Sequence, residues 1–173
     1  MISSQLKASN TGQRSVDSTA FRDAMARFPS GVTIVTTHDE NGRPHGFTAS
    51  SFCSVSAKPP LVLVCLAKSA NSYPVFAHND RFAVSILQAD HVHLARQFAS
   101  KNADKFACGG FIRTPHGATV LEEALAVVEC SVHNRYEAGD HMIMIGEVEQ
   151  VVLADRRRPA VYFDRAFSTI CSL

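Results

Sequence analysis

The sequence predicts a mainly β protein, either an antiparallel barrel or a sandwich, with a few peripheral helices. Segments rich in β-branched and aliphatic residues recur along the chain, as in the stretch GVTIVTT at residues 31–37. Turn signals separate several of these segments, and Asn41-Gly42 is a strong hairpin signal. Apolar residues at helical spacing stand out in residues 17–28 and 89–100. Strands joined by hairpins favour an antiparallel sheet over alternating strands and helices.

Two longer helices are expected. The first covers residues 17–28, where apolar side chains recur at helical spacing until Pro29 ends the run. The second covers residues 89–100, with Leu94 and Phe98 on one face. A loop leading into a shorter helix is expected at residues 68–79, between the strands expected at residues 61–67 and 82–87.

The strands are expected where β-branched or alternating apolar residues gather. In chain order these are residues 31–37, 61–67, 82–87, 124–138, 141–153 and 160–163. Residues 45–56 are interpreted as the return strand of the first hairpin and the loop beyond it. Near the C-terminus, Met142, Met144, Val148 and Val152 alternate with their neighbours and are predicted to share one face.

The chain has 173 residues, which predicts one domain. Residues 17–173 are assigned to this domain. Residues 1–16 are polar and lack the apolar core of a secretory signal, and a flexible N-terminal tail is expected there. A transit peptide is the alternative for the same segment.

Charge and cysteine usage exclude several classes of function. The formal net charge is +1, from 17 Lys and Arg against 16 Asp and Glu, so nucleic acid and anionic membranes are not expected partners. No apolar run approaches the ~20 residues of a membrane span. The five cysteines are odd in number and none form a C-x-x-C pair, which argues against structural zinc or a disulfide framework. A cytoplasmic location and no metal site are therefore expected.

Common nucleotide and hydrolase motifs are absent. The sequence contains no G-x-G-x-x-G, no G-x-x-x-x-G-K-[ST], no G-x-S-x-G and no H-E-x-x-H. A Rossmann site, a P-loop, an α/β-hydrolase elbow and a zincin helix therefore lack their signatures.

A hydroxyl-rich stretch at residues 45–56, HGFTASSFCSVS, is the first candidate site. Thr48, Ser50, Ser51 and Ser54 are interleaved with apolar residues. Small donors beside an apolar wall suit a flat heterocycle with polar atoms along one edge. The alternative is that these hydroxyls satisfy a bulge or a turn.

A second candidate cluster follows the strand at residues 61–67. Lys68, Ser69, Asn71 and Ser72 combine one positive charge with hydroxyl and amide donors. This combination can hold a phosphate without a P-loop. An ordinary capped loop is the alternative.

The third candidate is the turn Gly139-Asp140-His141, which places a histidine at the start of a strand. Histidine titrates near neutral pH and could position or polarise a redox ring. A structural histidine at a strand edge is the alternative.

Taken together, these stretches resemble the short-chain flavin reductases, the small components of two-component flavin-dependent monooxygenases. The resemblance covers about residues 20–168. It rests, in order, on FPSGVTIVTT, GFTASSFCSVSAKPPLVLVCLAKSANSY, FAVSIL, ARQFAS, DKF and GDHMIMIGEV.

The resemblance implies a Greek-key split β-barrel that is a homodimer and binds FMN or FAD. NADH or NADPH would donate a hydride to the flavin, and the reduced flavin would pass to a separate oxygenase. His141 would lie beside the flavin, where the nicotinamide stacks. The other implied contacts are with the ring edge and ribityl chain (Thr48, Ala49, Ser50, Ser51), the same pocket (Ser54, Cys65, Leu66) and the phosphate (Lys68, Ser69, Asn71, Ser72). Many relatives carry Asn where this chain has Ser85, so no role is carried over to that position.

Two other functions remain open from the sequence. One is a non-catalytic flavin- or haem-binding protein on the same barrel, because a fold does not fix a function. Haem would need an axial ligand such as His133, His141 or a cysteine. The other is an oxidase of a small phosphorylated cofactor.

Overall fold

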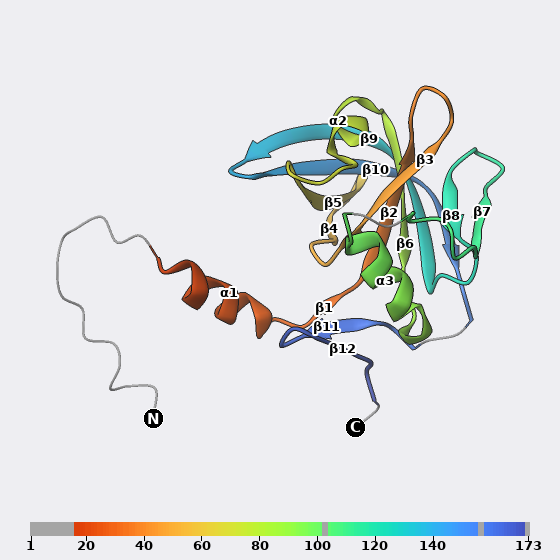
Figure 1. Cartoon of the computed structure of the whole chain (residues 1–173). Helices are drawn as coiled ribbons and strands as arrows, with labels where there is room; N and C mark the ends of the chain where they lie inside the picture. Colours follow the sequence, from red (N-terminus) through yellow and green to blue (C-terminus); the bar gives the residue numbers. More distant parts are fainter. Residues whose placement is uncertain (1–15, 102–103, 156–157, 172–173) are drawn as a thin grey trace, which may run out of the picture.

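The computed structural model describes residues 16–101, 104–155 and 158–171 (Figure 1). Except for Val16, the predicted N-terminal tail lies outside the described residues. Within the described part of the chain, no helix is both long enough and apolar enough to cross a membrane.

Seven strands form one antiparallel sheet in the order β3-β2-β6-β9-β10-β5-β4. Their bounds are β2 (Thr33–His38), β3 (Pro44–Ala49), β4 (Cys53–Ala57), β5 (Pro60–Ala67), β6 (Arg81–Ile86), β9 (Ala126–Ala138) and β10 (His141–Leu153). The predicted hairpins at Asn41-Gly42 and at Gly139-Asp140 join β2 to β3 and β9 to β10.

The two edge strands of this sheet, β3 and β4, are consecutive in the chain. Only residues 50–52 separate them. A connection this short brings the two edges together, so the sheet curls into a barrel with a seam between β3 and β4 (Figure 1). This confirms the predicted mainly β, split-barrel fold. The hydroxyl-rich stretch HGFTASSFCSVS therefore lies at the seam.

Two apolar clusters lie on the two sides of β2. The inner cluster inside the curled sheet includes Val35 and Met144, and the outer cluster between the sheet and the second predicted helix includes Ile34 and Phe98. Alternate side chains of a strand point to opposite faces, and both faces of β2 are covered by an apolar cluster. Residues 33–37 are therefore all buried. This explains why residues 33–37 are β-branched throughout and do not alternate between apolar and charged side chains.

The helices lie around the barrel. Their bounds are α1 (Ser18–Ala26), α2 (Tyr73–His78), η1 (Ala89–His91) and α3 (Val92–Ala99). Phe76 of α2 is buried in the inner cluster, 5.0 Å from the ring of Phe47. The helix α1 projects from the body and has no buried residue (Figure 1).

Two small sheets complete the fold, and most of their strands were not predicted. One contains β1 (Ser30–Gly31), β11 (Val161–Phe163) and β12 (Ala166–Ser168), and the other contains β7 (Phe111–Arg113) and β8 (Thr119–Leu121). Each of these strands has only two or three residues, too few to show a periodic pattern.

The predicted shared face of β10 is correct only for its first half. Met142 and Met144 are buried and Val148 packs against the inner cluster, but Val152 is 60% exposed. The pairing with β9 shifts between Val148 and Gln150, which marks a bulge. Val151 and Leu153 on the other face are also exposed, so the end of β10 extends beyond the apolar core on both of its faces.

Candidate functional site

A cavity of about 370 Å³ lies at the seam of the barrel, and we call it the seam cavity. Its walls come from the ends of β3, β5 and α3, from the turn after β5, and from the start of β10. It brings together most of the predicted site residues: Thr48, Ala49, Ser50, Ser51, Cys65, Leu66, Ser69, Asn71 and His141.

Ser51 closes the seam. Its hydroxyl accepts a 2.9 Å hydrogen bond from the backbone amide of Cys65, and lies 3.4 Å from the carbonyl of the same residue. A side chain thus links the β3–β4 connection to β5 where no strand ladder does. The hydroxyl of Ser51 shapes the cavity wall rather than standing free.

The hydroxyl of Thr48 is also used within the protein. It donates a 2.6 Å hydrogen bond to the carbonyl of Ala95 and so fastens α3 to β3. The carbonyl of the buried Ala49 accepts a 3.1 Å bond from Thr33. These contacts hold the end of β3 in place, whereas Ser50 is exposed beside them.

The turn after β5 forms another wall. The amide of Ala70 donates to the carbonyl of Ala67 at 3.0 Å, and the Asn71 side chain donates to the carbonyl of Lys101 at 2.8 Å. The hydroxyl of Ser72, whose residue is 3% exposed, has no hydrogen-bond partner within the described part of the chain. A buried hydroxyl without a partner is rare in native proteins and marks a place where a bound group could accept or donate.

His141 stands at the rim of the seam cavity. It pairs with Ala67 across the β5–β10 ladder, and its Nδ1 lies 2.8 Å from Oδ1 of Asp140. The hydrogen bond with His141 lowers the pKa of the Asp140 carboxyl. The ionised carboxylate holds Nδ1 and leaves Nε2 as the other ring nitrogen available to a ligand.

Two lysines that the sequence did not single out also line the seam cavity, Lys101 and Lys105. Nζ of Lys105 donates a 2.8 Å hydrogen bond to the carbonyl of Gly46, and burial lowers the pKa of this amine. The motif DKF carried the available signal, because it places a lysine after α3.

Comparison of the sequence with known protein families decides the assignment. The sequence profile of the family described as "flavin reductase like domain" matches residues 25–170. The chain belongs to this family. The resemblance inferred from the sequence is thereby confirmed.

Similar proteins support the same assignment. The chain is 61% identical over 156 residues to the actinorhodin polyketide dimerase of Streptomyces coelicolor, covering 90% of this chain and 88% of that protein. It is 32% identical over 155 residues to HsaB of Rhodococcus jostii, the reductase subunit of a flavin-dependent monooxygenase, covering 90% and 79%. The solved structure of the NADH:FAD oxidoreductase SgcE6 of Streptomyces globisporus, in complex with NAD and FAD fragments, matches with a TM-score of 0.84 at 36% identity, covering 90% and 93%.

Four positions considered in the sequence lie outside the seam cavity of this flavin reductase-like chain, and one of them is Ser72, described above. Ser54 is exposed on the edge strand β4, and Nζ of Lys68 forms an ion pair with Glu137 on β9. The roles predicted for these two residues stay predictions. Ser85 is fully buried on β6, where its hydroxyl accepts a 3.0 Å bond from the amide of Leu121.

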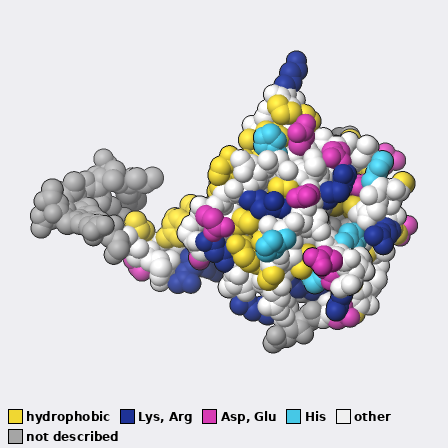
Figure 2. Space-filling view, turned by 90° about the horizontal axis from the view of Figure 1, so that it is seen from above, with side chains coloured by type: hydrophobic (Ala, Val, Ile, Leu, Met, Phe, Trp, Pro, Cys, Tyr) yellow, Lys and Arg dark blue, Asp and Glu magenta, His cyan; other side chains and the backbone are white. Residues whose placement is uncertain are grey.

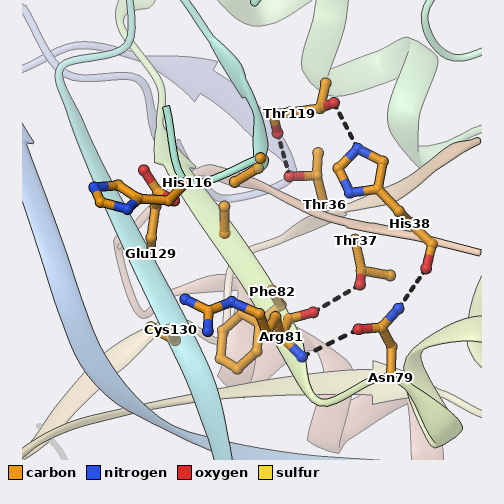
Figure 3. Close-up of a pocket in the computed structure, with 13 residues that line it drawn as sticks. Thr36, Thr37, His38, Asn79, Arg81, Phe82, His116, Thr119, Glu129 and Cys130 are labelled. Carbon is orange, nitrogen blue, oxygen red and sulfur yellow. Dashed lines mark hydrogen bonds between the residues drawn. The ribbon is translucent and has the colours of Figure 1, made fainter. Parts of the chain in front are cut away.

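A smaller cavity of about 130 Å³ lies apart from the predicted site residues, between β2, β6, β9 and the β7–β8 turn (Figure 3). Nε2 of His38 lies 2.8 Å from the hydroxyl of Thr119, and Thr36 and Thr37 donate to the carbonyls of Thr119 and Arg81. These groups satisfy one another and fasten the small hairpin to the barrel. Ligand pockets usually measure about 300–1,000 Å³, so this cavity is too small for a flavin.

Proposed function

We propose that this chain is an NAD(P)H:flavin oxidoreductase, which reduces FMN or FAD and supplies the reduced flavin to a separate monooxygenase. The observation that carries the proposal is the seam cavity, which joins the hydroxyl-rich stretch, the turn after β5 and His141 in a chain of the flavin reductase like family.

The residues present fit a flavin. The ring needs a flat apolar wall and polar groups along one edge, and the ends of β3 and β5 supply backbone groups beside Phe47 and Leu66. The phosphate needs donors and positive charge, which Ser69, Asn71 and Lys101 supply at the other end.

The protein's part in the reaction is to bind and orient. A bound flavin would supply the ring that accepts a hydride from the nicotinamide. The end of β3 and residues 65–67 hold the ring edge, and the end of α3 covers the cavity. His141, held by Asp140, orients the nicotinamide at the rim.

The first experiment measures oxidation of NADH and of NADPH at 340 nm, each with FMN, FAD, riboflavin or no flavin. We expect oxidation that depends on added flavin and on one preferred nicotinamide. If flavin binds but no pair of nicotinamide and flavin gives oxidation, the chain is a flavin-binding protein and not a reductase.

A second candidate function follows from the relative that is 61% identical, which is named a polyketide dimerase. We propose that a polyketide is the substrate of the partner monooxygenase, and not of this chain. The purified chain is incubated with NADH, flavin and a polyketide monomer. No dimer is expected without a partner oxygenase, and dimer formed by the chain alone would make it the dimerase.

The proposed active form is a homodimer. Phe21, Met25 and Phe28 on and beside α1 are 57%, 55% and 72% exposed, and apolar side chains are visible on this projecting segment in Figure 2. A nine-residue helix is marginal in water unless it packs against something. Light scattering is expected to give twice the chain mass for the wild-type protein. For the double variant Phe21→Ser, Met25→Ser it is expected to give the mass of a single chain. A monomeric wild-type chain would contradict the proposal.

The cytoplasm is the proposed location. All five cysteines are free thiols, including the exposed Cys53, Cys108 and Cys171. Exposed thiols persist in reducing compartments. Fractionation of the producing cells is expected to find the NADH-dependent flavin reduction in the cytoplasmic fraction, and recovery elsewhere would contradict this.

A further inference from the structure

A second cavity of about 490 Å³ continues from the seam cavity, and we call it the side cavity. Asn71, Lys101 and Lys105 line both cavities and form their common boundary. The side cavity lies under the β2–β3 hairpin, where Arg43 and His45 line it. A ligand that fills the seam cavity can therefore extend past the three boundary residues into a second space.

The charges around the side cavity favour an anion. Three of its lining residues are basic, namely Arg43, Lys101 and Lys105, against one carboxylate, Asp104. Asp39 on the hairpin does not line the cavity, and Oδ2 of its carboxylate lies 3.1 Å from Nε2 of His45. On the face shown in Figure 2 both signs of charge are otherwise interspersed, and the whole chain carries a formal net charge of only +1. The excess of basic side chains is therefore local to this cavity.

A buried donor points to the same place. Ser72 lines the side cavity next to the boundary residue Asn71. Its hydroxyl is buried and has no partner among the described residues. Since buried hydroxyls are nearly always hydrogen-bonded, this one is suited to a ligand group such as a phosphate oxygen.

We propose that the side cavity binds the adenylate half of FAD, with the pyrophosphate at the boundary formed by Asn71, Lys101 and Lys105. This rests on the proposed function, because the flavin ring must occupy the seam cavity. FMN ends at its phosphate, whereas FAD continues from that phosphate through a second one to adenosine. The half-buried ring of Phe106 supplies an apolar wall for the adenine.

Binding of riboflavin, FMN and FAD to the whole chain, followed by flavin fluorescence, tests this without measuring turnover. For the wild-type chain we expect the tightest binding for FAD, then FMN, then riboflavin. For Arg43→Glu we expect the ratio of FAD to FMN affinity to fall about tenfold, which corresponds to about 1.4 kcal/mol. Arg43 is exposed, so the folded state should tolerate the change.

Arg113→Glu is the matched control. Arg113 is exposed on β7 and lines neither cavity, and the substitution changes the net charge by the same amount. An equal fall in the affinity ratio for both variants would mean a general charge effect and would overturn the proposal. An unchanged ratio in Arg43→Glu would overturn it as well.

The boundary is tested with Lys101→Met and Lys68→Met. We expect Lys101→Met to reduce the affinity for FMN relative to riboflavin by more than Lys68→Met does. The reverse order would place the phosphate at Lys68 and overturn the assignment of the boundary. A wild-type chain that binds no flavin at all would instead refute the proposed function.

Discussion

The backbone amide of Cys65 donates a 2.9 Å hydrogen bond to the hydroxyl of Ser51 across the seam of the barrel. On its other side, Cys65 pairs with Ile143 in the β5–β10 ladder. The hydroxyl of Ser51 therefore stands where the next strand would be. The gap that this leaves between β3 and β5 is the seam cavity, so one serine both closes the barrel and shapes its site.

Ser51→Ala is expected to lower the free energy of unfolding by about 1–3 kcal/mol, because it leaves a partly buried amide without a partner. Denaturant unfolding measures the change. Ser54→Ala is the control, since Ser54 is exposed on β4 and surface substitutions usually change stability by less than about 0.5 kcal/mol. Equal effects in the two variants would show that the Ser51 bond contributes nothing.

His141→Ala is expected to slow NADH oxidation about tenfold without abolishing it, the worth of about one hydrogen bond. Hydride transfer runs directly between the two cofactors, so the histidine positions the nicotinamide but carries no obligatory proton. Turnover and KM for NADH are measured together. His133→Ala is the matched control, because this side chain is 46% exposed against 44% for His141 and lies away from the seam cavity. If both variants behave like the wild type, His141 is outside the site.

Gly146→Ala is expected to prevent normal folding or to lower stability by about 1–3 kcal/mol. A Cβ at this position would lie 2.4 Å from Cζ of Phe82 and 2.8 Å from Cβ of Cys130, inside the inner cluster. Gly31→Ala is the control, since a Cβ there meets nothing within 4 Å and no positive φ is required. Thermal unfolding compares the two, and a Gly146→Ala chain as stable as Gly31→Ala would contradict the packing seen around β10.

The sequence predicted the parts of the fold that depend on neighbouring residues. The hairpins follow from local turn chemistry, and the buried strands from runs of β-branched residues. The exposed end of β10 could not be predicted, because its apolar residues Val151, Val152 and Leu153 extend beyond the core, and the sequence does not show where the core ends. The apolar spacing in residues 17–28 predicts the helix α1. It does not predict that the apolar face is exposed, since the sequence does not show what the helix contacts.

The site residues also divide into those that local motifs predicted and those that they missed. Thr48, Ser51 and His141 lie in short motifs, and the structure does bring them to one cavity. Lys101 and Lys105 were missed because their position depends on α3 being fastened to β3, and no local pattern shows that contact. Proximity between residues far apart in the chain is what the sequence pattern alone does not supply.

The pH dependence of stability is expected to carry a contribution from Cys130. Burial, and then the nearby Glu149 and Glu129, raise the pKa of this thiol to about 12 from an ordinary value of 9.0. Above pH 9.0 the unfolded chain loses the thiol proton while the folded chain keeps it. The folded state then binds the additional proton, so the free energy of unfolding falls by about 1.4 kcal/mol per pH unit until the folded thiol also ionises.

Cys130→Ala removes this contribution. Urea unfolding between pH 9 and about 10.5 is expected to show a shallower loss of stability with pH in the variant than in the wild-type chain, by up to about 1.4 kcal/mol per pH unit. The slope, and not the absolute stability, is compared, because removing the buried sulfur also leaves a small void in the inner cluster. Lysines and tyrosines titrate in both chains and cancel in the difference. Identical slopes would mean that the Cys130 thiol ionises in the folded protein as readily as in the unfolded chain.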